Sequence, residues 1–176
     1  MATTTWNLDA AHSEVNFKVK HLVISTVSGK FKNFSSAVSA DGDDFSTASI
    51  SFEIESGSID TGMDMRDNHL RGEEFFSAEA FPKIIFTASN IRLAAGSEGE
   101  IEGHLTIRDV TKPIRLKVEF GGIAKDPYGQ IKAGFEVEGK IKRSEFGLSW
   151  NAMTEAGGAV VSDEVKFQAN VQYIKQ

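Results

Sequence analysis

The sequence predicts an all-β fold in which one antiparallel sheet closes into a barrel and a short helix plugs one end. Apolar and polar residues alternate through seven or eight stretches, the pattern of strands that bury one face. Turn-forming residues separate these stretches, and helical spacing is convincing only at residues 60–72. Because each strand has one polar face, the sheet must close or fold over to hide the other.

The strands are expected in a simple order along the chain. Residues 6–13 are interpreted as a lead-in segment, and residues 108–113 as a connection between strands. Residues 126–129 are interpreted as a turn with proline at its second position. The strands themselves are predicted at residues 15–20, 28–34, 50–55, 83–88, 100–107, 114–120, 131–142 and 165–173.

The helix has recognisable start and stop signals. Asp60 or Thr61 is expected to cap its N-terminus, because either side chain can accept a hydrogen bond from a backbone N–H. Gly72 is expected to end it in the left-handed conformation. Pro82 has no N–H for a sheet ladder, so it is expected at the start of the next strand.

A two-sheet sandwich is the alternative to a barrel. Strands of about ten residues favour the barrel, since sandwich strands are usually shorter. A closed barrel also removes the exposed edges that long strands would otherwise present. The length of 176 residues indicates a single domain, residues 1–176.

Composition excludes several classes of function. The net charge of −6 argues against a nucleic-acid partner, which requires a basic surface. The chain has no cysteine, so disulfides and thiolate metal sites are excluded. The N-terminus lacks the basic and apolar regions of a signal peptide. The sequence as given is therefore expected to be cytoplasmic, or periplasmic if a leader has been removed from it.

The side chains that face the barrel interior determine whether the protein can bind a ligand there. The inward positions carry no charge on the clear strands and mix large residues with small ones such as Gly103 and Gly139. The small residues either complement the large ones in a packed interior or leave an elongated apolar tunnel for a long hydrocarbon. The predicted lumen residues are Val15, Phe17, Val19, Ile50, Phe52, Ile54, Phe86, Leu105, Leu116, Val118, Phe135, Val137, Phe167 and Val171.

Residues 63–76 are predicted to form a gate over the barrel mouth. Asp67 is expected to pair with Arg71 four residues later, or to turn inward toward Arg143 or a histidine. The gate and mouth residues are Met63, Arg66, Asp67, Leu70, Phe75, Phe76 and Phe81.

Polar residues near the predicted strand and helix ends are candidates for contacting a ligand headgroup. They are His12, His21, His69 and Arg143, and the three histidines are expected to converge at one mouth. Imidazoles are common zinc ligands, so a metal-assisted hydrolase or a lipid isomerase is the alternative hypothesis. Nothing resembles a His-Glu-x-x-His motif or a nucleophile elbow. We therefore expect no catalytic residue, no metal and no cofactor.

Several motifs, in this order, resemble those of the YceI-like family over nearly the whole chain. They are Asp9-x-x-His12-Ser13, Phe17-x-x-x-His21, Gly29-x-Phe31, Ser58-Ile59-Asp60-Thr61, Arg66-Asp67-x-His69-Leu70, Phe75-Phe76, Phe81-Pro82-x-Ile84-x-Phe86, Gly103-x-Leu105-Thr106-Ile107-x-x-Val110-Thr111-Lys112-Pro113 and Arg143-Ser144-x-Phe146-Gly147.

The resemblance implies a lipocalin-like barrel and a function. It implies that the lumen binds, sequesters or transports a polyisoprenoid, an isoprenoid quinone or a fatty amide. Transient contact with a membrane and a homodimer are also expected. The family offers no defined catalytic motif, so the resemblance implies a binding protein.

Overall fold

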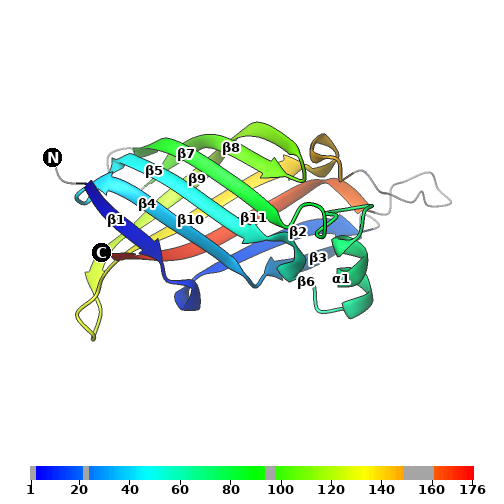
Figure 1. Ribbon diagram of the computed structural model, residues 1–176, viewed down its shortest axis with the longest axis horizontal. Coiled ribbons are helices and arrows are strands. Elements are labelled where there is room, and N and C mark those ends of the chain that lie inside the picture. The colour runs from blue at the N-terminus through cyan, green and yellow to red at the C-terminus, as the bar shows by residue number, and fades with distance from the viewer. Residues whose placement is uncertain (1–2, 22–23, 94–97, 149–160) are drawn as a thin grey trace.

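The chain forms one antiparallel sheet that closes on itself (Figure 1). Neighbouring strands follow the order β1-β4-β5-β7-β8-β9-β10-β11, and β1 also pairs with β11, which closes an eight-stranded barrel. Strands β2, β3 and β6 continue the sheet from β11. The computed structural model describes residues 3–21, 24–93, 98–148 and 161–176.

The elements have the following bounds. The strands are β1 (Thr3–Leu8), β2 (Glu14–His21), β3 (Ser25–Phe31), β4 (Phe34–Asp41), β5 (Asp44–Glu55), β6 (Ile59–Asp60), β7 (Lys83–Leu93), β8 (Glu98–Ile107), β9 (Val110–Lys125), β10 (Ile131–Lys142) and β11 (Val161–Lys175). The helix is α1 (Asp64–Arg71), and short 3-10 turns span Ala10–His12, Ser56–Ser58 and Arg143–Phe146. No helix in these ranges is long and apolar enough to cross a membrane.

The predicted barrel is confirmed, and three segments differ from expectation. Residues 6–8, interpreted as lead-in, belong to β1, and residues 110–113 belong to β9. The turn before β9 is only two residues long, with Arg108 at a φ of 57°. Strand β4 was not predicted as a separate strand because its sequence, rich in serine and alanine, alternates only weakly in hydrophobicity.

Strands β1 and β2 share one edge of β11. Strand β1 pairs with the C-terminal end of β11 at Tyr173, and β2 pairs with its N-terminal part. Between them, Asp9 forms an ion pair with Lys132 at the start of β10, with 2.8 Å between Oδ2 and Nζ. The carboxylate of Asp9 also accepts a 2.8 Å hydrogen bond from Nδ1 of His12. This charge cluster therefore fixes the β1–β2 connection onto β10.

The hydrogen bond from Lys132 lowers the pKa of Asp9 below its ordinary value of 3.8. A carboxylate whose pKa is lower in the folded state stabilises the fold above its unfolded pKa, and this contribution is lost as pH falls through the folded pKa. We expect Lys132→Met to lower stability at pH 7 and to flatten the decline in unfolding free energy between pH 5 and pH 2. Denaturant titrations across that range measure both effects.

The exposed Lys166 on β11 supplies the matched control. Replacement of Lys166 by methionine should leave the decline in unfolding free energy at acid pH, the acid limb of the stability profile, unchanged. If Lys132→Met kept the same acid limb as the unaltered protein, the assignment of Asp9 as an acid-sensitive group would be wrong.

Helix α1 lies beyond the ends of β6 and β3, at the right-hand end of the barrel in Figure 1. The two predicted signals at its ends are wrong. Its N-cap residue is Met63, whose side chain makes no capping hydrogen bond, rather than Asp60 or Thr61. Gly72 has an extended backbone with a φ of −78°, not a left-handed one.

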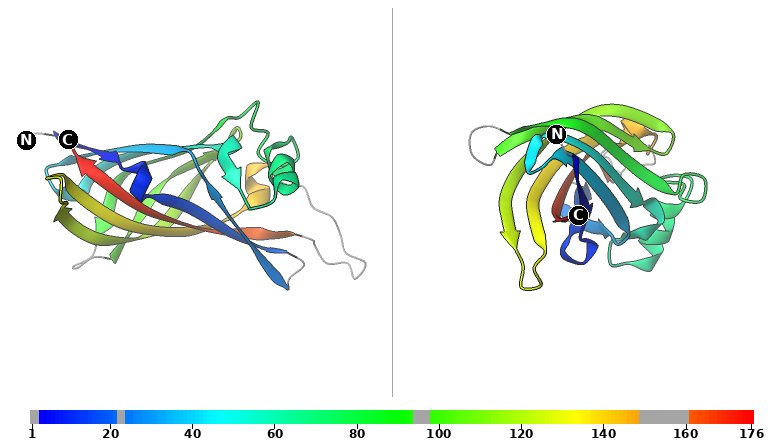
Figure 2. Two further views of the ribbon diagram at one scale, coloured as in Figure 1. Left: turned by 90° about the horizontal axis from the view of Figure 1, so that it is seen from below. Right: turned by 60° about the vertical axis from the view of Figure 1, so that its left-hand side comes forward.

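The interior contains two clusters of buried apolar residues, one toward each end of the barrel. The first includes Trp6, Phe45 and Phe135 and lies at the end of the barrel where β1 pairs with the C-terminal end of β11. The second includes Ile59, Phe75 and Phe146 and lies at the α1 end. Figure 2 shows the two ends apart along the long axis of the molecule.

Candidate functional site

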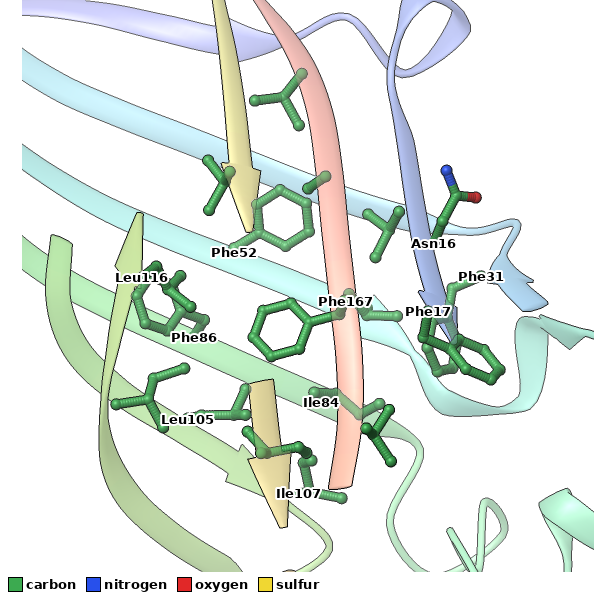
Figure 3. A pocket seen from close by; sticks show the side chains of 18 of the residues that line it. Asn16, Phe17, Phe31, Phe52, Ile84, Phe86, Leu105, Ile107, Leu116 and Phe167 are labelled. Atoms are coloured by element: carbon green, nitrogen blue, oxygen red, sulfur yellow. The ribbon is translucent and has the colours of Figure 1, made fainter. Parts of the chain in front are cut away.

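An apolar cavity of about 240 Å³ lies inside the barrel between these clusters. Side chains from most strands point into it, as Figure 3 shows for Phe52, Phe86 and Phe167. All fourteen predicted lumen residues line it. Of the lining side chains in the described part of the chain, only Asn16, Arg143 and Tyr173 carry polar groups. Whether these residues contact a lipid stays a prediction.

The interior is hollow and not merely loosely packed. A single water requires ~10–15 Å³, so 240 Å³ far exceeds a packing defect. The inward side chains of Phe52, Val137 and Phe167 are only half-buried, because part of their surface faces the void. A cavity with such walls offers dispersion contacts and no hydrogen-bonding partners along most of its length.

The inward glycines complement the aromatic rings, as one of the two sequence hypotheses expected. Gly139 pairs across the sheet with Phe167, and a Cβ at Gly139 would lie 2.8 Å from that ring. A Cβ at Gly103 would lie 2.7 Å from the ring of Phe86. The absence of side chains at these glycines lets the rings lie against the barrel wall. The cavity remains even though aromatic rings fill the space beside these glycines.

Tight aromatic packing seals the end of the lumen near the chain termini. The ring centroids of Trp6 and Phe45 lie 5.0 Å apart, and Phe45 also meets Phe120 and Phe135 at 5.4 and 5.0 Å. Burial raises the pKa of Tyr173 to about 12, while its hydroxyl shares a 2.8 Å hydrogen bond with Ser36. This phenol therefore stays neutral and places no charge at the sealed end of the lumen.

Side chains from α1 and the segment after it cover the other end. Leu70, Phe75 and Phe76 all line the cavity, as their predicted role in a gate requires. The ring of Phe76 packs edge-on against Phe31 of β3, with centroids 5.9 Å apart. Phe31 also meets Phe17 of β2, with ring centroids 5.6 Å apart. Because a short helix and the segment after it cover this end, and not strands of the closed barrel, the α1 end is the candidate mouth.

Hydrogen bonds to residue 61 anchor α1. Oδ1 of the buried Asp67 accepts hydrogen bonds from the backbone N–H and the hydroxyl of Thr61, at 2.8 and 2.5 Å. Arg66 donates to the hydroxyl and carbonyl oxygens of Thr61. The predicted pairing of Asp67 with Arg71 or Arg143 is wrong. The guanidinium of Arg71 instead donates to the carbonyl oxygens of Gly57 and Ile59.

We expect Asp67→Ala to loosen α1, because it leaves two donors of Thr61 without their acceptor. Loss of a buried acceptor costs about 1–3 kcal/mol. Hydrogen exchange of the amides in residues 61–71 should become about tenfold faster or more, which corresponds to ~1.4 kcal/mol. Asp64→Ala, at an exposed position in the same helix, is the matched control. Equal exchange rates in the two variants would show that the Asp67 contacts do not hold the helix.

Arg143 is the one charged side chain among the described residues that line the cavity. It is only 5% exposed, and burial lowers the pKa of its guanidinium. Its Nε and Nη1 donate to the carbonyl oxygens of Ser162 and Leu148, at 3.0 and 2.6 Å. The guanidinium also lies 5.9 Å from the ring centre of Phe75. The charge is thus held beside the gate.

The described histidines do not converge at one mouth, so that prediction is wrong for them. His12 lies in the turn between β1 and β2, 61% exposed and paired with Asp9. His69 lies on α1, where Nε2 pairs with Glu74. The side chain of His21 lies outside the described residues. The described part of the chain contains no group of three metal-ligating side chains. The hydrolase hypothesis therefore has no geometric support there.

Met63 and Phe81, two of the predicted gate and mouth residues, do not line the cavity, since Met63 is 54% exposed and Phe81 packs under Arg108. Other lining residues were absent from the prediction. Val38 and Phe45 line the cavity but were not predicted, because β4 and the start of β5 lack strong alternation. Further lining residues absent from the prediction include Phe31, Ile59, Ile91, Ile101, Ile107, Ile114, Ile141, Leu148 and Val165.

Comparisons with known proteins place this chain in a family. The model of the YceI-like domain matches residues 6–173. A UPF0312 protein of Staphylococcus aureus (strain USA300) is 37% identical over 171 residues, which cover 97% of each chain.

Solved structures of similar proteins share the barrel. The YceI protein of Campylobacter jejuni is 35% identical, covers 96% of each chain and gives a TM-score of 0.75. BcnA of Burkholderia cenocepacia is 25% identical over 94% of this chain and 98% of its own, with a TM-score of 0.81. A polyisoprenoid binding domain from Saccharophagus degradans covers 97% and 98%, with a TM-score of 0.73. At 17% identity, that domain shows likeness of fold alone. The family model and the curated relative together show that the chain belongs to the YceI-like family.

Proposed function

We propose that this protein binds one long apolar lipid in its lumen and sequesters or carries it. The observation that carries the proposal is the cavity of about 240 Å³, which is lined almost entirely by apolar side chains. Walls of this kind match a hydrocarbon and offer little to a polar substrate. The tail points toward the sealed aromatic end, and the polar end lies at the α1 mouth beside Arg143.

Partition energetics favour a carrier over an irreversible trap. Moving a twenty-carbon chain from water into an apolar lumen gains ~16 kcal/mol, at ~0.8 kcal/mol per methylene. A lipid held in a membrane starts from hydrocarbon, so almost none of that gain remains when it moves into the lumen. Exchange between membrane and lumen is then nearly balanced and runs in both directions. This reversibility suits transport or buffering of a lipid.

The ligand class that we propose is a polyisoprenoid, an isoprenoid quinone or a fatty amide. Each has one long apolar chain and a small polar end, in keeping with a lumen that has polar groups at few positions. The polyisoprenoid binding domain of Saccharophagus degradans has the same barrel, which makes a prenyl chain the first candidate to test.

Fluorescence titration tests the proposal. The delipidated protein is titrated with cis-parinaric acid, a single-chain polyene that fluoresces in apolar surroundings, and the probe is then displaced with a polyprenol, a quinone or a fatty amide. We expect saturable binding of one probe per chain and displacement by at least one of these lipids. Absence of saturable binding by folded protein would refute the proposed function.

A further inference from the structure

Exposed apolar side chains gather at the mouth end of the barrel. Met65 of α1 is 84% exposed, and Ile24, directly before β3, is 86% exposed. Met63, beside Met65, is 54% exposed. Figures 1 and 2 show α1 at the same end of the molecule as the C-terminal end of β2 and the start of β3. We call these three residues the mouth surface.

The opposite end offers an internal comparison. The remaining large apolar side chains that are exposed in the described ranges lie in or beside the β9–β10 turn, and they are Ile123, Tyr128 and Ile131. That turn lies at the far left of the barrel in Figure 1, next to the sealed end of the lumen. Its apolar residues therefore have no access to the cavity.

The two faces of α1 differ in what they contact. Leu70 lines the lumen, and Met65 lies five positions earlier, about 140° around the helix. The helix therefore presents one apolar residue to the cavity and another to the outside. A bilayer that Met65 enters would therefore touch the same helix that covers the mouth.

Charge on this segment indicates the kind of surface that it meets. Exposed carboxylates at Asp64, Glu73, Glu74 and Glu79 flank the methionines. The two arginines of α1 are occupied by backbone and threonine oxygens of residues 57–61. Anionic bilayers attract clusters of lysine and arginine. Residues 63–79 contain no lysine, and their exposed carboxylates offset the charge of the exposed Lys18 and Lys20 on the neighbouring strand β2. A neutral bilayer, contacted through apolar side chains, fits this balance of charges.

We infer that the mouth surface, Ile24, Met63 and Met65, docks on the surface of a neutral lipid bilayer and brings the α1 end of the lumen against it. This inference rests on the proposed function, because it describes how the lipid reaches the cavity. A long apolar lipid has almost no solubility in water, so the mouth must touch the bilayer for the lipid to pass. The sealed end has no reason to do so.

The test compares two double variants with the unaltered protein. Ile24→Gln with Met65→Gln removes apolar area at the mouth, and Ile123→Gln with Tyr128→Gln removes it at the sealed end. Each protein takes up cis-parinaric acid in two ways, from phosphatidylcholine vesicles and from a dilute aqueous dispersion. The rate of the fluorescence rise is measured from each source, at low and at high salt.

We expect uptake from vesicles by the mouth variant to be about tenfold slower or more, with unchanged affinity for the dispersed probe. The sealed-end variant should match the unaltered protein, and salt should change none of the rates. Equal vesicle rates in both variants, with normal binding of the dispersed probe, would overturn docking and leave the proposed function standing. Failure of all three proteins to bind the probe from either source would overturn the proposed function and this inference together.

Discussion

Tryptophan at position 137 should block the lumen and reduce lipid affinity at least tenfold, equivalent to ~1.4 kcal/mol. Val137 lies near the middle of β10, lines the cavity and is only half-buried because it faces the void. An indole at this position occupies space that the lipid chain requires. Since the new ring enters a void and not a packed core, overpacking should be slight. Titration with cis-parinaric acid measures the affinity, and thermal denaturation checks the fold.

The neighbouring residue provides the control for this prediction. Glu138 is exposed on the outer face of the same strand. Glu138→Trp adds the same ring outside the barrel, so it should leave lipid affinity unchanged. If Val137→Trp bound lipid as tightly as Glu138→Trp while remaining folded, the lipid would have to occupy some other site.

Removal of the bound lipid should lower the melting temperature by on the order of 10 °C or more. An unfilled cavity costs about 24 cal/mol per Å³ in core-mutant series. For 240 Å³ this amounts to about 6 kcal/mol, which a well-fitting chain recovers in part. At this chain length, each 1 kcal/mol shifts the melting temperature by ~2–4 °C. Thermal denaturation of delipidated and reloaded samples measures the difference.

Val137→Trp again separates the possible causes of such a shift. With the lumen filled by its own side chain, this variant should gain little from added lipid. A melting temperature that did not change on reloading the unaltered protein, or that rose equally in the variant, would contradict stabilisation through the cavity.

The sequence was informative about which side of each strand faces inward. Alternation assigns the two faces of a strand directly, so all fourteen predicted lumen residues line the cavity. The prediction of inward faces failed in strands whose alternation of apolar and polar residues is weak. Strand β4 buries Val38 and Ala40 among serines, a pattern too polar to identify as a wall of an apolar cavity.

Contacts between distant segments were beyond prediction. The anchoring of α1 through Asp67 depends on where β6 places Thr61, and helical spacing carries no information about that position. His12 and His69 each lie near an element end, as expected, but those ends lie at different places along the barrel. Periodicity locates a residue within its element and leaves the packing of the elements undetermined.

Whether the lumen is hollow could not be derived from residue sizes. Gly139 and Gly103 fit a packed interior as well as a tunnel, because the outcome depends on where the neighbouring rings lie. In the structure, Phe167 and Phe86 lie over these glycines. Space along the axis stays open between the aromatic cluster of Trp6, Phe45 and Phe135 at one end and the side chains that cover the α1 end.

Native mass spectrometry tests the central claim, an apolar lumen that holds a lipid, most directly. The protein is purified without detergent, and one sample is sprayed intact. A second sample is stripped of lipid, incubated with phosphatidylcholine vesicles that contain a polyprenol, and then sprayed. We predict a mass increase of one lipid per chain in the unaltered protein and in Glu138→Trp, and none in Val137→Trp. Folded protein that stayed at its chain mass throughout, or an equal increase in Val137→Trp, would contradict the claim.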